Sequence, residues 1–435
     1  MSKRLNFWYG SIFGTYWMIY AVVSSFASVF MLAKGYTNAQ IGMTLAAANI
    51  LAVVLQPVTA NLADRSEKIG AIGISQIMTV MMMVFTIGMF CFGGGSIALC
   101  VTFVLLIAWH TALQPMFNAL TFKLEESGIP VNFGIARSVG SLAYSILVAV
   151  LGTIVENLGI MTLPVTGEII CFMLLVSLFF TGRTFAQAKR AKAGAASAQP
   201  AGDERTMEEP AGNDRVQEEE AGTAQALEEQ TGTDQALEEP AEEQIPLREF
   251  IRRNKLFFVL NIGVVGLFFS NSILNNYMVQ IVTDVGGTSE DMGRILGVMA
   301  FLEIPTMVLF TRLKRRFSCQ LLLKVAAAGF TVKIAMCWLA GSVAMLYAAQ
   351  AFQLVSFALF LPGMVYFTGE NMSPGEAVRG QALFTTMITV TTIFSSLLGG
   401  WILDVSGAKM LTFIATLATA AGAVIVFAVV DRIRK

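Results

Sequence analysis

The sequence predicts an all-α membrane protein with twelve transmembrane helices arranged as two six-helix bundles. Of its 435 residues, 55% are hydrophobic and 14% are charged, with a mean hydropathy of +0.66, whereas soluble domains carry roughly 25% charged residues. Apolar runs long enough to cross a bilayer, about 20 residues each, recur along the chain. These runs lack the strict alternation of barrel strands, so helices are the way to satisfy their backbone groups in lipid.

The apolar runs fall into two sets of six, separated by one long polar segment. The first set lies at about 7–33, 39–62, 70–92, 96–122, 131–154 and 160–181. The second set lies at about 255–283, 292–311, 319–340, 343–369, 377–402 and 408–430. We therefore expect an N-terminal six-helix bundle over residues 1–182 and a C-terminal six-helix bundle over residues 255–435.

The polar segment, residues 183–254, is the expected linker between the bundles, and acidic residues dominate it. Between Asp203 and Glu243 there are 15 acidic residues against Arg205 and Arg215, which leaves a balance of +12 for the rest of the chain. From Ala201 the segment repeats every ten residues, beginning with AGDERTMEEP and AGNDRVQEEE. Because few apolar side chains are available to offset the entropy of ordering, we expect a disordered tether. A regulatory or partner-binding segment is the alternative.

Lysine and arginine residues gather in the connections on one side of the predicted membrane, which sets the orientation of the chain. If the N-terminus is cytoplasmic, the connections on the outer side hold only Lys34, Arg294 and Lys409. We therefore expect both termini and the linker to be cytoplasmic, in a multi-pass protein of the plasma membrane.

A short motif after the second span resembles the major facilitator superfamily. NLADRSEK is similar to that family's G-x-L-x-D-R-x-G-R-[RK] loop: Asp64 and Arg65 match it, Ala60 replaces the first glycine, and Glu67 interrupts the basic end. The resemblance implies that Asp64 and Arg65 form a cytoplasmic latch, which opens during alternating access. The alternative is simple anchoring of the helix end by positive charge.

Within that superfamily, the chain is similar to the lactose-permease-like branch, which includes oligosaccharide:proton symporters, nucleoside:proton symporters and phenylpropionate transporters. LQPVTANLADR resembles the branch's span-two motif, NFGIARSVGSLAYSI its span-five motif, and RGQALFTT the start of its span eleven. The similarity covers nearly the whole chain apart from the acidic linker. It implies two bundles that rock around a central site near the middle of the membrane.

Ionisable side chains inside the predicted spans are candidates for function, because each costs about 2.5 to 3.5 kcal/mol to insert. Glu303 and Lys333 fall near the middle of successive spans, where pairing would offset their desolvation. A purely structural ion pair is the alternative. The sequence has five such residues: His110, Arg137, Glu168, Glu303 and Lys333.

Arg137 and Tyr144 lie seven residues apart, on one face of the predicted fifth-span helix. The resemblance implies that Arg137 binds substrate and that Tyr144 stacks on a sugar ring. It also implies that Glu303 binds substrate hydroxyl groups and that Lys333 is the cation of the charge network. The alternative for Arg137 is a side chain that reaches the cytoplasmic interface beside a core tyrosine.

The chain departs from the permease pattern in span ten. Gln353 and Ser356 replace the histidine and glutamate that handle the proton in that protein. Proton coupling would then use Glu303, with Glu168 or His110 as the other candidates. His110 is the sole histidine and titrates near physiological pH, although a neutral histidine bonded between helices is the alternative.

Span four shows a second departure. The carboxylate that partners the binding arginine in the permease falls here near Asn118 or Ala119, neither of which carries negative charge. Arg137 could then pair with an anionic substrate, and we assign Asn118 to the substrate-binding set.

The sequence thus predicts a secondary transporter that imports a small polar solute, most simply a sugar-like one, by proton symport. We expect a monomer in the lipid bilayer, with no nucleic acid partner and no cofactor other than the proton gradient. No metal or nucleotide site is expected, since the five cysteines lack ligand spacing and no GxxxxGK[ST] signature occurs. No span or loop holds a nucleophile next to a general base, so an enzyme is not expected.

Three other functions stay open at this point. One is uptake of an aromatic or other small carboxylate, and another is efflux of amphipathic compounds by proton antiport. Outside transport, the chain could be a membrane sensor or scaffold that acts through the acidic linker.

Overall fold

The computed structural model describes residues 2–65, 70–126, 133–197 and 247–433, and helix is the only regular structure in them. The all-α class predicted from the sequence is confirmed. The acidic decapeptide repeats lie outside the described residues, so their predicted disorder stays a prediction.

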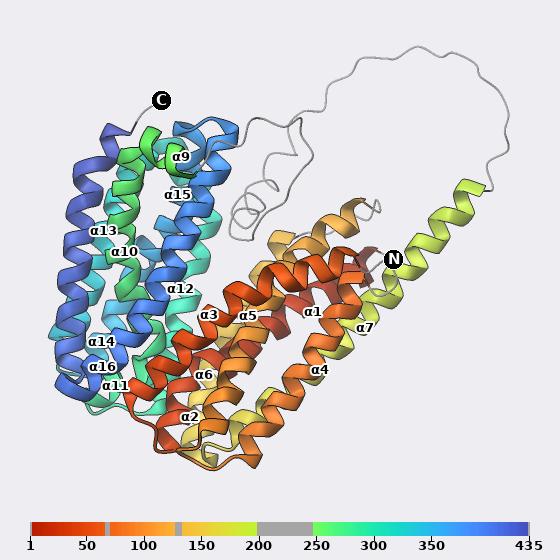
Figure 1. The fold of residues 1–435 in the computed structure, drawn as a ribbon, viewed down its shortest axis with the longest axis horizontal. Helices are drawn as coiled ribbons and strands as arrows, with labels where there is room; N and C mark the ends of the chain where they lie inside the picture. The colour runs from red at the N-terminus through yellow and green to blue at the C-terminus, as the bar shows by residue number, and fades with distance from the viewer. Residues whose placement is uncertain (1, 66–69, 127–132, 198–246, 434–435) are drawn as a thin grey trace.

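The first six spans form one bundle, which is coloured red to yellow-green in Figure 1. Its first span consists of α1 (Ser2–Tyr20), the π-helix η1 (Ala21–Ser25) and α2 (Ala27–Ala33). The other five are α3 (Asn38–Arg65), α4 (Gly70–Cys91), α5 (Ile97–Glu126), α6 (Phe133–Leu158) and α7 (Thr162–Ser197).

The second bundle is coloured green to blue in Figure 1 and begins after the short helix α9 (Leu247–Arg253). Its seventh and eighth spans are α10 (Lys255–Asn276) with α11 (Met278–Asp284), and α12 (Ser289–Arg316). The ninth is α13 (Cys319–Leu339). The tenth consists of α14 (Val343–Gln350), the 3-10 helix η2 (Ala351–Val355) and α15 (Phe357–Asn371).

The last element, α16 (Pro374–Val429), holds two spans and is followed by the 3-10 turn η3 (Val430–Arg432). It is bent at Gly407, whose φ of 77° lies in the left-handed region that favours glycine. Eleven helical segments of the described residues are long and apolar enough to cross a membrane, and the last of them covers 58 residues. At about 20 residues for each crossing, that segment accounts for the eleventh and twelfth spans.

The predicted linker is helical at both of its ends. Helix α7 continues beyond residue 182 as far as Ser197, and α9 covers Leu247–Arg253. The part of the predicted linker for which no structure is described is therefore residues 198–246.

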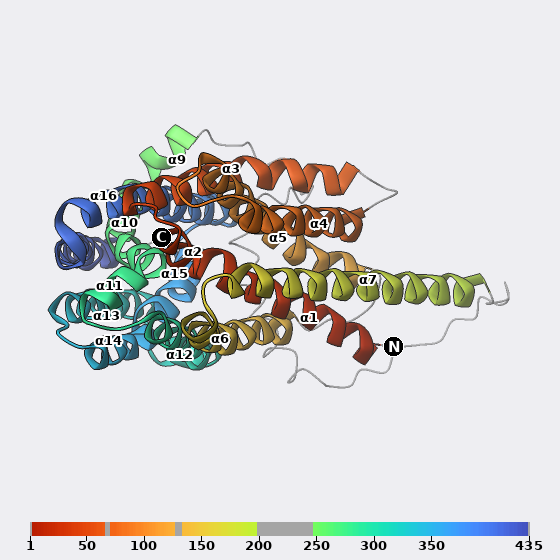
Figure 2. The ribbon, with the colours of Figure 1, turned by 90° about the horizontal axis from the view of Figure 1, so that it is seen from below.

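The two bundles meet at one end and diverge toward the end that carries both chain termini (Figure 1), and Figure 2 shows them side by side from below. We call the end where they meet the junction. Helices α3 and α16 form one seam of the junction, and α6 and α12 form the other.

Glycines let the backbones approach closely in both seams. A Cβ atom at Gly42 of α3 would meet the carbonyl of Ser396, and one at Gly400 of α16 would meet the backbone of Asn38. In the other seam, a Cβ at Gly293 of α12 would lie 3.1 Å from the backbone of Gly152. One apolar core is accordingly continuous through the junction.

Three spans are interrupted along their length. The first contains the π-helix η1, the seventh is broken at Tyr277, and the tenth changes to a 3-10 turn that ends at Val355. Ser28 Oγ donates a hydrogen bond to the Asn276 carbonyl at 2.5 Å, so the interrupted regions of the first and seventh spans contact one another across the junction. Helix interruptions of this kind are frequent at functional sites.

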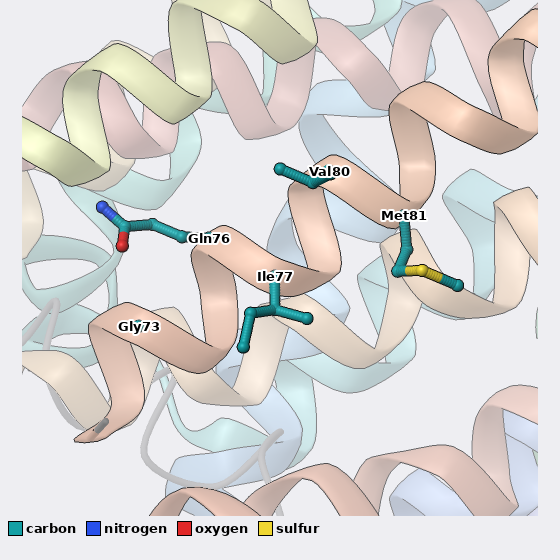
Figure 3. Close-up of a pocket in the computed structure, with 5 residues that line it drawn as sticks. All are labelled: Gly73, Gln76, Ile77, Val80 and Met81. Carbon is teal, nitrogen blue, oxygen red and sulfur yellow. The ribbon is translucent and has the colours of Figure 1, made fainter. Parts of the chain in front are cut away.

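Exposed apolar side chains cover the outside of the bundles, as expected for a surface that faces lipid. Helix α4 carries an open groove on this surface, and none of the predicted site residues lies in it (Figure 3). The groove is lined by Gly73, Gln76, Ile77, Val80 and Met81.

Candidate functional site

The two ionisable groups predicted to pair in the C-terminal bundle are joined through a third side chain. Lys333 of α13 donates from Nζ to Oε1 of Gln353 in η2, and Gln353 Nε2 donates to Oε1 of Glu303 in α12 at 2.6 Å. An amide therefore lies between the carboxylate and the ammonium. We call these three residues the charge chain.

The interruption of the tenth span places Gln353 in the charge chain. Helix α14 ends at Gln350, and the 3-10 turn that follows carries Gln353. Thr306 of α12 donates to the Leu354 carbonyl at 2.9 Å. Gly329 of α13 packs so closely that a Cβ there would lie 2.8 Å from the Val355 carbonyl. The interruption is thus held by the same two helices that carry Glu303 and Lys333.

Burial differs along the charge chain. Lys333 and Gln353 are each 1% exposed, whereas Glu303 is partly exposed. Lys333 Nζ also lies 3.5 Å from Met299 Sδ. Glu303 is therefore the more exposed end of the charge chain.

Helix α6 of the N-terminal bundle, which packs against α12, carries Arg137. Its Nη1 donates to Ser141 Oγ at 2.8 Å, and its guanidinium lies over the ring of Trp17, 4.2 Å from the ring centroid. Gly140 makes this contact possible, because a Cβ there would meet the Trp17 ring and the Phe13 carbonyl. Stacking on an aromatic face suits the planar guanidinium and holds it in one orientation.

Trp17 was not singled out from the sequence. It is one of several aromatic residues in the first span, and no spacing within that span indicates a contact with Arg137 of the fifth. Only the packing of α1 against α6 brings the two together.

Tyrosines extend the aromatic surface away from Trp17. The Tyr20 ring lies 5.5 Å from Trp17 and 5.9 Å from Tyr144, measured between ring centroids. Tyr144 is 7% exposed, and its hydroxyl shares a hydrogen bond of 2.9 Å with Ser25 of η1. Trp17 and Tyr20 are partly exposed, so they are more accessible than Tyr144, the ring chosen from the sequence.

The charge chain and the aromatic surface lie within electrostatic reach of one another. The charges of Lys333 and Arg137 both act on the Glu303 carboxylate, which in turn acts on the hydroxyl groups of Tyr20 and Tyr144. Arg137, Tyr144, Glu303 and Lys333 come from three different spans, and the fold brings them within electrostatic reach of one another.

His110 of α5 lies within the N-terminal bundle and is 1% exposed. Its ring stacks on Tyr16 at 4.2 Å, and Nε2 lies 3.0 Å from the Tyr16 carbonyl. A carbonyl can only accept, so Nε2 carries the hydrogen, and Nδ1 has no hydrogen-bond partner among the described residues. This arrangement fits a neutral histidine held between helices, and the proton role of His110 stays a prediction.

Asn118 and Glu168 are partly exposed residues of the N-terminal bundle, on α5 and α7. Within the part of the chain that the structure describes, Oδ1 of Asn118 and Oε1 of Glu168 are buried atoms without a hydrogen-bond partner. The substrate-binding role of Asn118 stays a prediction.

The predicted cytoplasmic latch lies at the end of α3, where the Arg65 side chain is exposed. The side chain of Asp64 lies outside the described part of the chain, as do residues 66–69. Helices α3 and α16 pack together at the junction but diverge toward this end (Figure 1). The latch role of Asp64 and Arg65 stays a prediction.

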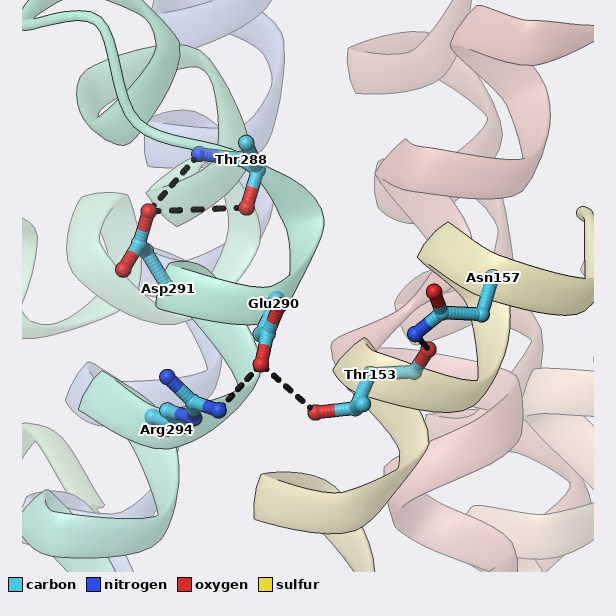
Figure 4. Close-up of polar contacts among 6 residues, drawn as sticks. All are labelled: Thr153, Asn157, Thr288, Glu290, Asp291 and Arg294. Carbon is cyan, nitrogen blue, oxygen red and sulfur yellow. Dashed lines mark hydrogen bonds and ion pairs between the residues drawn. The ribbon is translucent and has the colours of Figure 1, made fainter.

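Carboxylates of the C-terminal bundle fasten both seams of the junction. In the seam of α6 and α12, Glu290 accepts from Thr153 Oγ1 at 3.1 Å and pairs with Arg294 (Figure 4). In the seam of α3 and α16, Asp404 accepts from the Asn38 backbone N–H at 3.0 Å, the Asn38 side chain at 2.9 Å and the Ala39 N–H at 2.7 Å. Neither carboxylate was predicted to take part.

No group of three or more histidine, cysteine, aspartate or glutamate residues that could hold a metal ion occurs within the described ranges.

Comparison with known proteins gives one family and a set of similar folds. The family described as "MFS_1 like family" matches residues 9–415. A protein of Deinococcus radiodurans named "Putative sugar efflux transporter" is 31% identical over 115 residues, which are 26% of this chain and 29% of that protein.

Solved structures resemble the whole chain. The crystal structure of the nucleoside transporter NupG has a TM-score of 0.71 at 13% identity, with 98% of each chain covered. A single-site mutant of NupG has the same TM-score and identity, with 98% of this chain and 99% of that one covered. At this identity, the similarity establishes the fold.

Proposed function

This chain belongs to the MFS_1 like family of the major facilitator superfamily, and from that membership we propose that it imports a small polar, sugar-like solute by proton symport. The superfamily predicted from the sequence is confirmed, and the chain is a multi-pass membrane transporter rather than an enzyme. Beyond that membership, we propose protons as the coupling ion, a sugar-like molecule as the solute and import as the direction. We also propose that the protein is a monomer in the plasma membrane with both termini in the cytoplasm.

One observation carries the proposal: the partly exposed end of a buried charge chain lies within electrostatic reach of a guanidinium that stacks on an aromatic ring. Trp17 and Tyr20 offer apolar faces on which a ring can pack. Arg137 and Glu303 offer a donor and an acceptor for hydroxyl groups. A ring that carries hydroxyl groups satisfies both surfaces, which favours a sugar-like solute.

Glu303 is the residue we propose as the proton carrier. As a carboxylate it is held by Gln353, whereas in the protonated form it has an O–H group with which to bind the solute. Loading then requires both proton and solute at Glu303, and the empty carrier returns with Glu303 deprotonated. The bundles rock around this site, so that the junction opens as the opposite end closes.

The test is transport by purified protein in liposomes, with sugars, nucleosides and aromatic acids added one at a time. A symported solute should make the medium outside more alkaline as protons enter with it. Glu303→Gln should retain exchange of labelled solute across the membrane but lose uphill accumulation, because Gln cannot release a proton.

Glu168→Gln is the matched control, since Glu168 is also a partly exposed glutamate within a span but outside the charge chain. Accumulation that survives Glu303→Gln and fails in Glu168→Gln would move the proton carrier to Glu168.

A second candidate function is efflux of a sugar by proton antiport. It is favoured by the similarity to the Deinococcus radiodurans protein named as a putative sugar efflux transporter, although that match spans only 29% of its length. The same liposomes separate the two functions. When solute is added outside, a symporter makes the outer medium more alkaline because protons enter with the solute, whereas an antiporter makes it more acidic because protons leave as the solute enters.

A further inference from the structure

We propose that Gln353 is a positioning residue for proton coupling: its amide links the carboxylate of Glu303 to the ammonium of Lys333 and favours the deprotonated form of Glu303. The inference rests on the proposed function, since it names how the central site handles its proton. It goes beyond that function because Gln353 cannot itself carry a proton.

The orientation of the Gln353 amide follows from its neighbours. A lysine ammonium has donors only, so the atom that faces Lys333 Nζ must be the amide oxygen. The amide NH₂ group is thereby directed to Glu303 Oε1, at 2.6 Å. Side-chain amides are often ambiguous between their two ends, but this one has a single assignment that satisfies both contacts.

This orientation discriminates between the two protonation states of Glu303. An N–H donor forms a stronger hydrogen bond to a carboxylate than to a neutral carboxyl group. The positive charge of Lys333 polarises the amide in the same direction, because the ammonium draws on its oxygen. The linked chain therefore stabilises the Glu303 carboxylate, and protonation weakens the link and leaves Glu303 available to solute.

The backbone around Gln353 makes the link rigid. Its 3-10 turn is tied to α12 through Thr306 and packed against α13 at Gly329, the helices of the two charged residues. Thr306 lies three residues after Glu303, on the neighbouring position of the same helix face. The backbone that carries the Gln353 side chain is thus fixed relative to both charged residues.

The same span supplies a matched control. Gln350 is also completely buried, three residues before Gln353, but its Nε2 donates only within its own helix, to the Leu346 carbonyl at 3.1 Å. Changing each glutamine to methionine removes an amide of the same size from the same span. Only the change at Gln353 removes the link between the charges.

The first experiment measures the pH dependence of solute affinity and uphill accumulation in liposomes. Gln353→Met should shift the affinity midpoint toward alkaline pH by about one unit, the effect of losing one hydrogen bond to a charged group. Because one pH unit corresponds to a factor of ten, uphill accumulation should fall by about tenfold, while exchange of solute is retained. Gln353→Glu should shift the midpoint further, because a second carboxylate repels Glu303, and Gln350→Met should match the wild type.

A second experiment measures the coupling between Glu303 and Lys333 without a transport assay. Thermal unfolding in detergent is measured for Glu303→Gln, Lys333→Met and the double variant, each with Gln353 and with Gln353→Met. We expect the two changes to be non-additive with Gln353 present and closer to additive without it.

An unchanged pH profile in both Gln353→Met and Gln353→Glu, or equal non-additivity in both backgrounds, would overturn the proposal. Wild-type protein that moves solute without protons would instead refute the proposed symport, and the unfolding cycle would still decide whether Gln353 links the two charges.

Discussion

The two sides of the central site differ in what they offer to a solute. The N-terminal bundle presents aromatic rings and one guanidinium, which is held by Ser141 and Trp17 of the same bundle. The C-terminal bundle presents the charge chain, whose members are likewise bonded within their own bundle. For the symport that we propose, the difference predicts a division of labour: the N-terminal side sets solute affinity and the C-terminal side couples transport to protons.

Because each side retains polar partners of its own, separating the bundles does not leave these charges without partners. The bonds that must break when the junction opens lie elsewhere, in the seams fastened by Asp404 and Glu290. Variants of the two sides should therefore have separable effects, on coupling in one case and on affinity in the other.

Removing the cation of the charge chain should have the largest effect. Lys333→Met leaves the Glu303 carboxylate and the Gln353 oxygen without the ammonium. Removing one charged partner of a buried network costs up to about 3 to 5 kcal/mol of unfolding free energy. We expect a clear drop in unfolding temperature and loss of uphill accumulation.

Lys324→Met is the control for that variant, since Lys324 is on the same helix but pairs with Asp431 near the surface. A Lys333→Met protein that accumulates solute like the Lys324→Met protein would end the assignment of coupling to the C-terminal side.

Replacing the guanidinium on the N-terminal side should raise KM without affecting coupling. Arg137→Lys keeps the charge but loses the planar group that stacks on Trp17 and bonds Ser141. We expect KM to rise by about tenfold, the equivalent of roughly 1.4 kcal/mol. At saturating solute the accumulation ratio should equal that of the wild type, and a reduced ratio would contradict the division of labour.

Removing the ring beneath the guanidinium should have a smaller effect of the same kind. Trp17 is partly exposed, so Trp17→Leu removes a cation–π contact of about 0.5 to 1 kcal/mol, and KM should rise by roughly two- to fivefold. Trp8→Leu is the control on the same helix, because Trp8 stacks on Phe180 and not on Arg137. Equal KM changes in the two variants would show that Trp17 acts through the stability of α1 alone.

The spans could be predicted well from the sequence. Polar side chains are costly in lipid, so the residues that cross the membrane are mostly apolar and hydropathy identifies them. The same cost picked out Glu303, Lys333 and Arg137, since an ionisable residue in a span stands out against apolar neighbours. It could not pick out Gln353 or Trp17. An uncharged glutamine and a tryptophan are ordinary residues of a span until a neighbouring helix supplies their partner.

The sequence by itself determined the twelve spans, their division into two sets and the few charges inside them, because each of these is a local property of composition and length. The tertiary structure decided which side chains meet. The interruption of the tenth span inserts Gln353 between Glu303 and Lys333, and close packing at Gly140 brings Trp17 under Arg137. These contacts depend on the approach of helices that are distant in sequence, for which periodicity and hydropathy carry no signal.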